Sequence, residues 1–254
     1  MLDEEPRPRP RDLKDDADTS VLYAKSYLLI RVSVGFIGIL LPIALMLGEW
    51  LLIREDVEFH GSLSAYYHSP MRDLFVASLS VTGFLLMTYM AGERRTSDFR
   101  VSLVAGVAVV GVAFFPTGRP GLEPGAALCG VVPEPAGCSS VQQALGEKLT
   151  AGIHFTFAAI FIIGLAVIAY LFARRDKDRN HERKYARIQH ICVWVIVASI
   201  VWVALGSFLP LTIGPFTPLY VGEVGSVWAF GVSWLIASRD LTAGITGYQP
   251  PGTK

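Results

Sequence analysis

The fold is decided by IHFTFAAIFIIGLAVIAYLFA (153–173), RRDKDRNHERKYAR (174–187) and ICVWVIVASIVWVALGSFLPLTI (191–213), where two long apolar runs enclose a segment with seven Lys and Arg residues. A helix of about 20 apolar residues crosses the ~30 Å hydrocarbon core of a bilayer, because it rises 1.5 Å per residue. Four further apolar runs occupy 32–53, 74–92, 101–115 and 219–237. The run at 101–115 is short, so a helix that crosses the membrane there must include flanking residues. We therefore predict an all-α integral membrane protein, a bundle of six transmembrane helices.

The positive charges are divided unequally between the segments that connect these runs. Eighteen of the 22 Lys and Arg residues lie in the N-terminal segment through Arg31, in 93–100, in 174–187 and in the tail from Arg239. The alternate segments hold only Arg54, Arg72, Arg119 and Lys148. Since cytoplasmic loops carry the excess of Lys and Arg, we expect both termini to be cytoplasmic. Topology explains the basic loops, so nothing indicates nucleic-acid binding.

Composition and turn signals divide the chain into three parts. Residues 1–26 are polar and rich in proline, which predicts a disordered cytoplasmic tail. Residues 27–240 form the predicted transmembrane domain, and 241–254 form a second cytoplasmic tail. The longest outer segment, 116–148, is rich in glycine and proline. We call it the lid, and expect a short helix at 139–148.

Two of the three cysteines, Cys129 and Cys138, lie in the lid, nine residues apart. Two cysteines in an outward-facing loop predict a disulfide, because the outer compartment is oxidising. Cys192 lies at the cytoplasmic start of the fifth run, and its expected role is packing.

Ionisable and polar residues collect near the outer ends of the predicted helices. The set comprises Glu49, His60, Ser62, Ser64, Tyr66, Tyr67, His68, Arg72, Asp73, His154, Ser207 and Glu223. Ionisable groups near hydrocarbon are costly unless they pair or face water, so they are candidates for function. We expect Asp73, His154 and Glu223 to share one outward-facing pocket because their depths match, with His68 and Arg72 at its rim.

Each of these residues also has a purely structural interpretation. Asp73 is favourable in the first turn of a helix, and His68 and His154 suit the interface. Glu223 has no basic residue in its own span or in the preceding outer turn, so it needs a partner from another helix, with His154 or Arg72 as candidates.

The functional hypothesis assigns catalysis to Asp73, His154 and Glu223. It assigns substrate binding to Ser64, Tyr66, Tyr67, His68 and Arg72. His68, His154 and Glu223 would hold a zinc-like metal in an alternative interpretation.

The segments SLSAYYHSPMRDLFVASLSVTGFLLMTYM (62–90), VAFFPTG (112–118) and GIHFTFAAIFI (152–162) resemble a family of uncharacterised bacterial six-span proteins. More distantly, the chain resembles the eukaryotic FRAG/DRAM/SFK group, which is associated with lipid remodelling. The resemblance covers residues 27–240 and is sharpest at 62–76. It implies importance for Ser64, Tyr66, Tyr67, Arg72, Asp73, Pro116 and His154, and it implies membrane lipid as the partner.

A second resemblance is carried by Ser64 and His68 alone, whose SxxxH spacing is similar to that of ceramidase-like hydrolases with a three-His zinc site. The HxxxH motif of those enzymes is absent here. The preferred hypothesis is an outward-facing polar pocket that binds or remodels a lipid or another amphiphile. The alternatives are a metal-dependent intramembrane hydrolase and a small transporter or channel. Homo-oligomerisation is left open.

Overall fold

The computed structural model describes residues 10–53, 60–89, 95–178, 183–206, 208–209, 213 and 216–246, and this part of the chain is helical without strands. The all-α prediction is therefore confirmed. The elements are α1 (Pro10–Ile53), the 3-10 helix η1 (Leu63–His68), α2 (Arg72–Thr88), α3 (Ser97–Phe114), α4 (Ser140–Leu145), α5 (Glu147–Asp178), α6 (Arg183–Gly206) and α7 (Pro218–Thr246).

Five helical segments in the described ranges are long and apolar enough to cross a membrane. They are Leu28–Ile53, Ser97–Phe114, Glu147–Arg175, Lys184–Gly206 and Pro218–Arg239. The remaining predicted run corresponds to α2, which has 17 residues. At 1.5 Å per residue α2 is about 26 Å long, slightly less than the hydrocarbon core. The helices leave many large apolar side chains exposed, including Phe84, Ile163 and Trp194, as expected for lipid contact.

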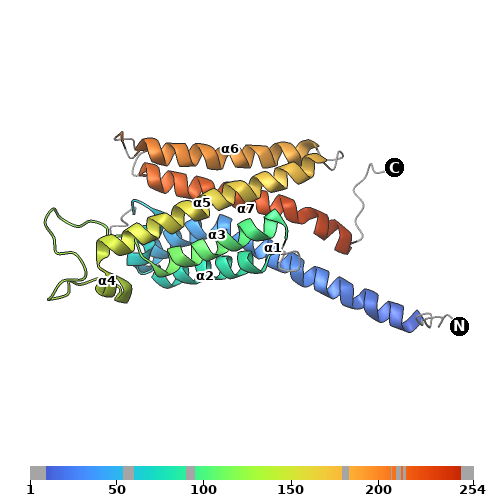
Figure 1. The fold of residues 1–254 in the computed structure, drawn as a ribbon, viewed down its shortest axis with the longest axis horizontal. Coiled ribbons are helices and arrows are strands. Elements are labelled where there is room, and N and C mark those ends of the chain that lie inside the picture. Colours follow the sequence, from blue (N-terminus) through green and yellow to red (C-terminus); the bar gives the residue numbers. More distant parts are fainter. Residues whose placement is uncertain are drawn as a thin grey trace.

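The six long helices form a closed ring. Around it, α1 packs on α2, α2 on α3, α3 on α5, α5 on α6, α6 on α7, and α7 returns to α1. Figure 1 shows the first turns of α1 (blue) and the last turns of α7 (red) at one end of the bundle, while α4 lies at the opposite end. The candidate site residues belong to the end that carries α4.

The first helix begins earlier than the composition indicates. α1 starts at Pro10, inside the segment 1–26 that the composition predicts to be disordered. Residues 1–9 lie outside the described part. Proline is favoured in the first turn of a helix, and the next proline is Pro42, so no residue in between is a strong helix breaker. The helix therefore continues from the apolar span back into the polar segment.

Glycines allow two pairs of helices to approach closely. A Cβ atom on Gly106 of α3 would lie 2.7 Å from the Gly83 carbonyl oxygen of α2 and 3.0 Å from the Met87 amide nitrogen. A Cβ atom on Gly231 of α7 would lie 2.9 Å from the Gly35 carbonyl oxygen of α1. Backbone atoms cannot move aside as side chains can, so these positions require glycine.

Substituting Gly106→Ala should lower the thermal stability of the detergent-solubilised protein, because α2 and α3 must separate. The expected loss is about 1–3 kcal/mol, the usual cost of overpacking. Gly152→Ala is the matched control, since nothing lies within 4 Å of a Cβ atom there. That helical glycine should tolerate alanine, with a gain of up to about 1 kcal/mol. Equal melting temperatures for the two variants would contradict the close packing of α2 on α3.

Candidate functional site

The short helix η1 is the element around which the site is built. Its residues Leu63–Tyr67 are buried. Ser62 is its N-cap, and the Ser62 hydroxyl accepts a hydrogen bond from the Ala65 amide at 3.0 Å. Tyr66 packs with apolar residues of α1, α2 and α7. A buried backbone must satisfy its amide groups, so the remaining free N–H groups at the start of η1 need acceptors.

Glu223 of α7 supplies one of these acceptors. Its Oε2 accepts a hydrogen bond from the Leu63 amide at 2.6 Å, and its Oε1 accepts one from the Ser64 hydroxyl at 3.4 Å. Glu223 and Ser64 also line a mostly apolar cavity of about 80 Å³ inside the ring, which we call the inner cavity. The Thr82 hydroxyl, buried in the wall of this cavity, has no hydrogen-bond partner in the described part of the chain.

On the other side of η1 lies a polar hollow of about 410 Å³, which we call the outer pocket. Its lining residues come from η1, the start of α2 and the lid, namely Tyr67, His68, Ser69, Arg72, Arg119, Pro120, Gly137 and Ser139. None of the described lining residues is a carboxylate. Three predicted binding residues, Tyr67, His68 and Arg72, therefore share one pocket, and the lid adds Arg119 and Ser139.

Arg72 is the exposed cation of the outer pocket. Its Nη2 donates to the Tyr67 hydroxyl at 2.8 Å, and its guanidinium carbon lies 4.5 Å from the centre of the Tyr67 ring. These contacts orient the guanidinium and use one of its five N–H donors. Tyr67, Arg72 and Asp73 also line an adjoining hollow of about 420 Å³. Asp73 is exposed there and forms no ion pair with another described residue.

Two histidines hold the turn that follows α3. His68 donates from Nε2 to the Thr117 carbonyl at 2.9 Å, and His154 donates from Nδ1 to the Phe115 carbonyl at 2.6 Å. His154 is only 1% exposed. Burial lowers the pKa of His68, although its hydrogen bond to Thr117 partly opposes this change. The His68 ring is therefore largely neutral at pH 7, and both rings position the lid.

An ion pair organises the lid from within. The Glu147 carboxylate accepts hydrogen bonds from the Arg119 guanidinium at 3.0 and 3.2 Å, from the Arg119 amide at 2.7 Å and from the Cys129 amide at 3.0 Å. The same guanidinium donates to the carbonyls of Ala127 and Ala136 at 2.7 and 2.9 Å. The charge of Arg119 is thus neutralised, whereas Arg72 forms no ion pair with another described residue.

The contacts that these lid residues make were not predicted from the sequence. For α4, a sequence signal existed: Ser139 and Gln142 fit the capping-box pattern S-x-x-Q. The two side chains bond to each other's backbone amides at 3.0 and 3.2 Å, and Gln142 Nε2 donates to the Thr117 carbonyl at 3.0 Å. The expected helix at 139–148 is therefore present as α4 and the start of α5. No sequence pattern pairs Arg119 with Glu147, which lie 28 positions apart.

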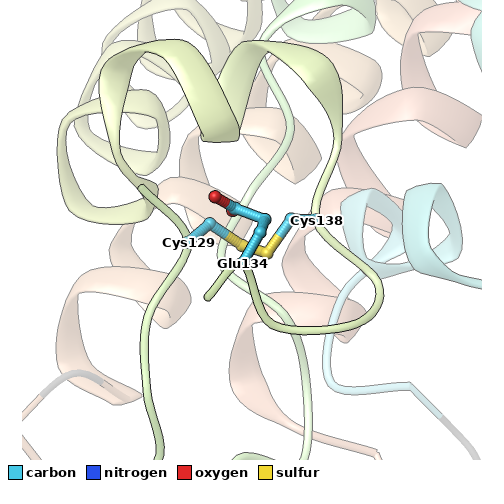
Figure 2. Close-up of side chains that lie close together, drawn as sticks. All are labelled: Cys129, Glu134 and Cys138. Atoms are coloured by element: carbon cyan, nitrogen blue, oxygen red, sulfur yellow. A yellow bond between two sulfur atoms is a disulfide. The ribbon is translucent and has the colours of Figure 1, made fainter. Parts of the chain in front are cut away.

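The sulfur atoms of Cys129 and Cys138 are joined in a disulfide, as the sequence predicts. Figure 2 shows Glu134 beside the two sulfurs, and these three side chains form the one group within the described ranges with metal-ligand spacing. A disulfide sulfur is not a thiolate ligand, so this group would bind a metal only after reduction. Cys192 is buried and free, as expected for a packing residue.

A second buried carboxylate lies near η1. Glu49 of α1 is 2% exposed, and its Oε1 is 2.8 Å from Nε2 of His60. The His60 ring meets the Tyr66 ring edge-on, with centroids 4.9 Å apart. Burial raises the pKa of Tyr66, and the neighbouring Tyr220 and Glu49 raise it further, so its hydroxyl stays protonated. Tyr66 is thus a core residue on the buried side of η1.

The trio Asp73, His154 and Glu223 is dispersed in the structure. Asp73 lies at the surface beside Arg72, His154 is held on Phe115, and Glu223 lies beneath η1. The partners of Glu223 are Leu63 and Ser64, in place of the expected His154 or Arg72. Within the described residues, His68, His154 and Glu223 do not bring their ligand atoms within 4.8 Å of one another.

Comparison with known proteins yields no match, whether with family models, with curated proteins or with solved structures.

Substituting Glu147→Gln should loosen the lid, because Arg119 would lose its counter-charge in a site where both side chains are largely buried. Breaking such a pair costs about 3–5 kcal/mol. We expect faster amide hydrogen exchange in 117–146, measured by mass spectrometry, with little change in α6 and α7. Glu123→Gln is the control, since that lid carboxylate is exposed. Unchanged exchange in Glu147→Gln would show that the pair does not hold the lid.

Proposed function

We propose that the chain is a six-span protein of the bacterial plasma membrane, with both termini cytoplasmic. The opposite placement of the α1 start and α4 along the bundle supports this topology (Figure 1). The charge distribution supports it as well, since the segments with most Lys and Arg would share one side. In this arrangement α2 crosses the membrane in addition to the five longer helices, and the outer pocket faces the periplasm.

Cysteine labelling in intact cells tests the topology. A cysteine introduced by Gly125→Cys in the exposed lid should react with a membrane-impermeant maleimide. A cysteine introduced by Lys177→Cys, at the exposed end of α5, should react only after the cells are permeabilised. The native Cys129 and Cys138 are bonded and Cys192 is buried, so the unmodified chain provides the background. Labelling at position 177 without permeabilisation would reverse or reject the topology.

We further propose that the outer pocket binds the anionic headgroup of a membrane lipid. The observation that carries this proposal is the state of Arg72, an exposed guanidinium that is oriented by Tyr67 and retains unused N–H donors. A planar guanidinium binds phosphate through paired, charge-assisted hydrogen bonds. Its described lining residues include no carboxylate that would compete for the guanidinium, and the Ser139 hydroxyl adds a polar group to its wall.

The position of the pocket favours a lipid over a free anion. Arg72 begins α2, so the pocket lies at the membrane interface, where phosphate headgroups are found. The exposed apolar side chains Leu74 and Phe114 lie next to this end of the bundle and suit the upper part of an acyl chain.

Substituting Arg72→Gln should weaken binding of phosphatidylglycerol about tenfold, the scale of one charge-assisted hydrogen bond. Native mass spectrometry of the protein in mild detergent measures this affinity. The control is Lys148→Gln, which removes an exposed cation at the same end of the bundle that does not line the pocket.

Three ligands separate the outcomes of this experiment. Stronger binding of phosphatidylglycerol than of phosphatidylcholine, lost in Arg72→Gln alone, would support an anionic-lipid pocket. Equal affinities for glycerol phosphate and phosphatidylglycerol would indicate a site for a free phosphate ester. Phosphatidylglycerol binding that is the same in the wild type and in Arg72→Gln would refute the proposal.

A further inference from the structure

A second hollow, separate from the outer pocket, lies on the membrane-facing side of the bundle between α5, α6 and α7. This groove of about 220 Å³, which we call the membrane groove, is mainly apolar. Its wall includes Phe155, Ile163 and Ile200, which are 50%, 55% and 36% exposed. All three belong to helices that are apolar enough to cross a membrane. A ligand would therefore reach the groove through the hydrocarbon of the bilayer.

Glu223 is the ionisable residue of this groove. Ala158, Ile162 and Glu223 line both the membrane groove and the inner cavity, so the two hollows adjoin at these residues. The Oε2 atom of Glu223 is bonded to the Leu63 amide at 2.6 Å. Its Oε1 has a longer contact of 3.4 Å with the Ser64 hydroxyl, and the Ser64 backbone amide also interacts with the carboxylate. A carboxylate can accept about four hydrogen bonds, so Glu223 retains capacity on Oε1.

The charge of Glu223 is not balanced by a basic side chain in its surroundings. Among the described residues, no Lys, Arg or His lines either the membrane groove or the inner cavity. An ionised carboxylate at membrane depth is costly unless a cation pairs with it. Two hydroxyl-bearing residues, Ser199 of α6 and Ser226 of α7, line the same groove and can accept hydrogen bonds. The groove thus offers one carboxyl group, nearby hydroxyl oxygens and an apolar channel.

We infer that the membrane groove binds a single-chain cationic amphiphile, a long-chain primary amine, that enters sideways from the outer leaflet. The ammonium group donates to Oε1 of Glu223 and to a serine hydroxyl, and its three N–H donors match these acceptors. The chain lies along α5 and α6 and continues into the bilayer. This inference is independent of the headgroup pocket, since Arg72 does not line the groove.

Binding of dodecylamine to the purified protein in nonionic detergent tests the inference. Native mass spectrometry should show dodecylamine bound at least about tenfold more tightly than dodecanol or dodecanoate, because only the amine places a positive charge on the carboxylate. Glu223→Gln should reduce amine affinity to the level of the alcohol. Glutamine keeps an oxygen for the Leu63 amide, so η1 should stay in place. Arg72→Gln should leave amine binding unchanged, which separates this site from the outer pocket.

A second pair of variants fills the groove without touching the carboxylate. Ala159→Phe places a ring in the groove and should abolish amine binding, whereas Ala204→Phe, on an exposed position of α6 outside both hollows, should retain it. If Glu223→Gln does not fold, the comparison of Ala159→Phe with Ala204→Phe still tests whether the amine binds in the groove. Equal amine affinity in the wild type, Glu223→Gln and Ala159→Phe would overturn the inference. A preference for dodecanol or dodecanoate over the amine would overturn it as well.

Discussion

The hydrogen bond from the Leu63 amide to the Glu223 carboxylate, 2.6 Å long, is the interaction on which the outer end of the bundle depends. A 3-10 helix buried among apolar helices has amide groups that neither water nor lipid can satisfy. Glu223 and the Ser62 hydroxyl accept two of them. With its first turn fixed, η1 separates the inner cavity, which Leu63 and Ser64 line, from the outer pocket, which Tyr67 and His68 line.

The charged side chains on the two sides of η1 differ in their partners. In the lid, Arg119 and Glu147 neutralise each other, and they hold backbone groups of a segment that has little regular structure. In the outer pocket, Arg72 donates to the Tyr67 hydroxyl, and further N–H donors remain on its guanidinium. On the inner side, Glu223 bonds to an amide and a hydroxyl, and no described basic residue lines the hollows beside it. The first arrangement fixes the backbone of the lid. The other two leave a guanidinium and a carboxylate available to ligands, at different depths.

The depth of each ionisable side chain along its helix was predictable from the sequence, whereas the direction in which the side chain points was not. Asp73, His154 and Glu223 each lie within a turn or two of a helix start, which made a shared pocket plausible. The rotation of each helix about its axis decides which neighbour a side chain meets. That rotation follows from packing, such as the contact of Gly83 with Gly106. As a result Asp73 faces the surface, His154 faces the Phe115 carbonyl, and Glu223 faces η1.

The sequence by itself determined the all-helical fold, because long apolar runs in hydrocarbon can satisfy their backbone groups only within a helix. It also determined the pairing of Cys129 with Cys138, since no other cysteine lies in the lid. Only the tertiary structure decided the partners of Glu147 and Glu223, which lie 28 and 160 positions away along the chain. The physical reason is that a carboxylate binds any suitably placed N–H group, including backbone amides, and backbone amides carry no signature in the sequence.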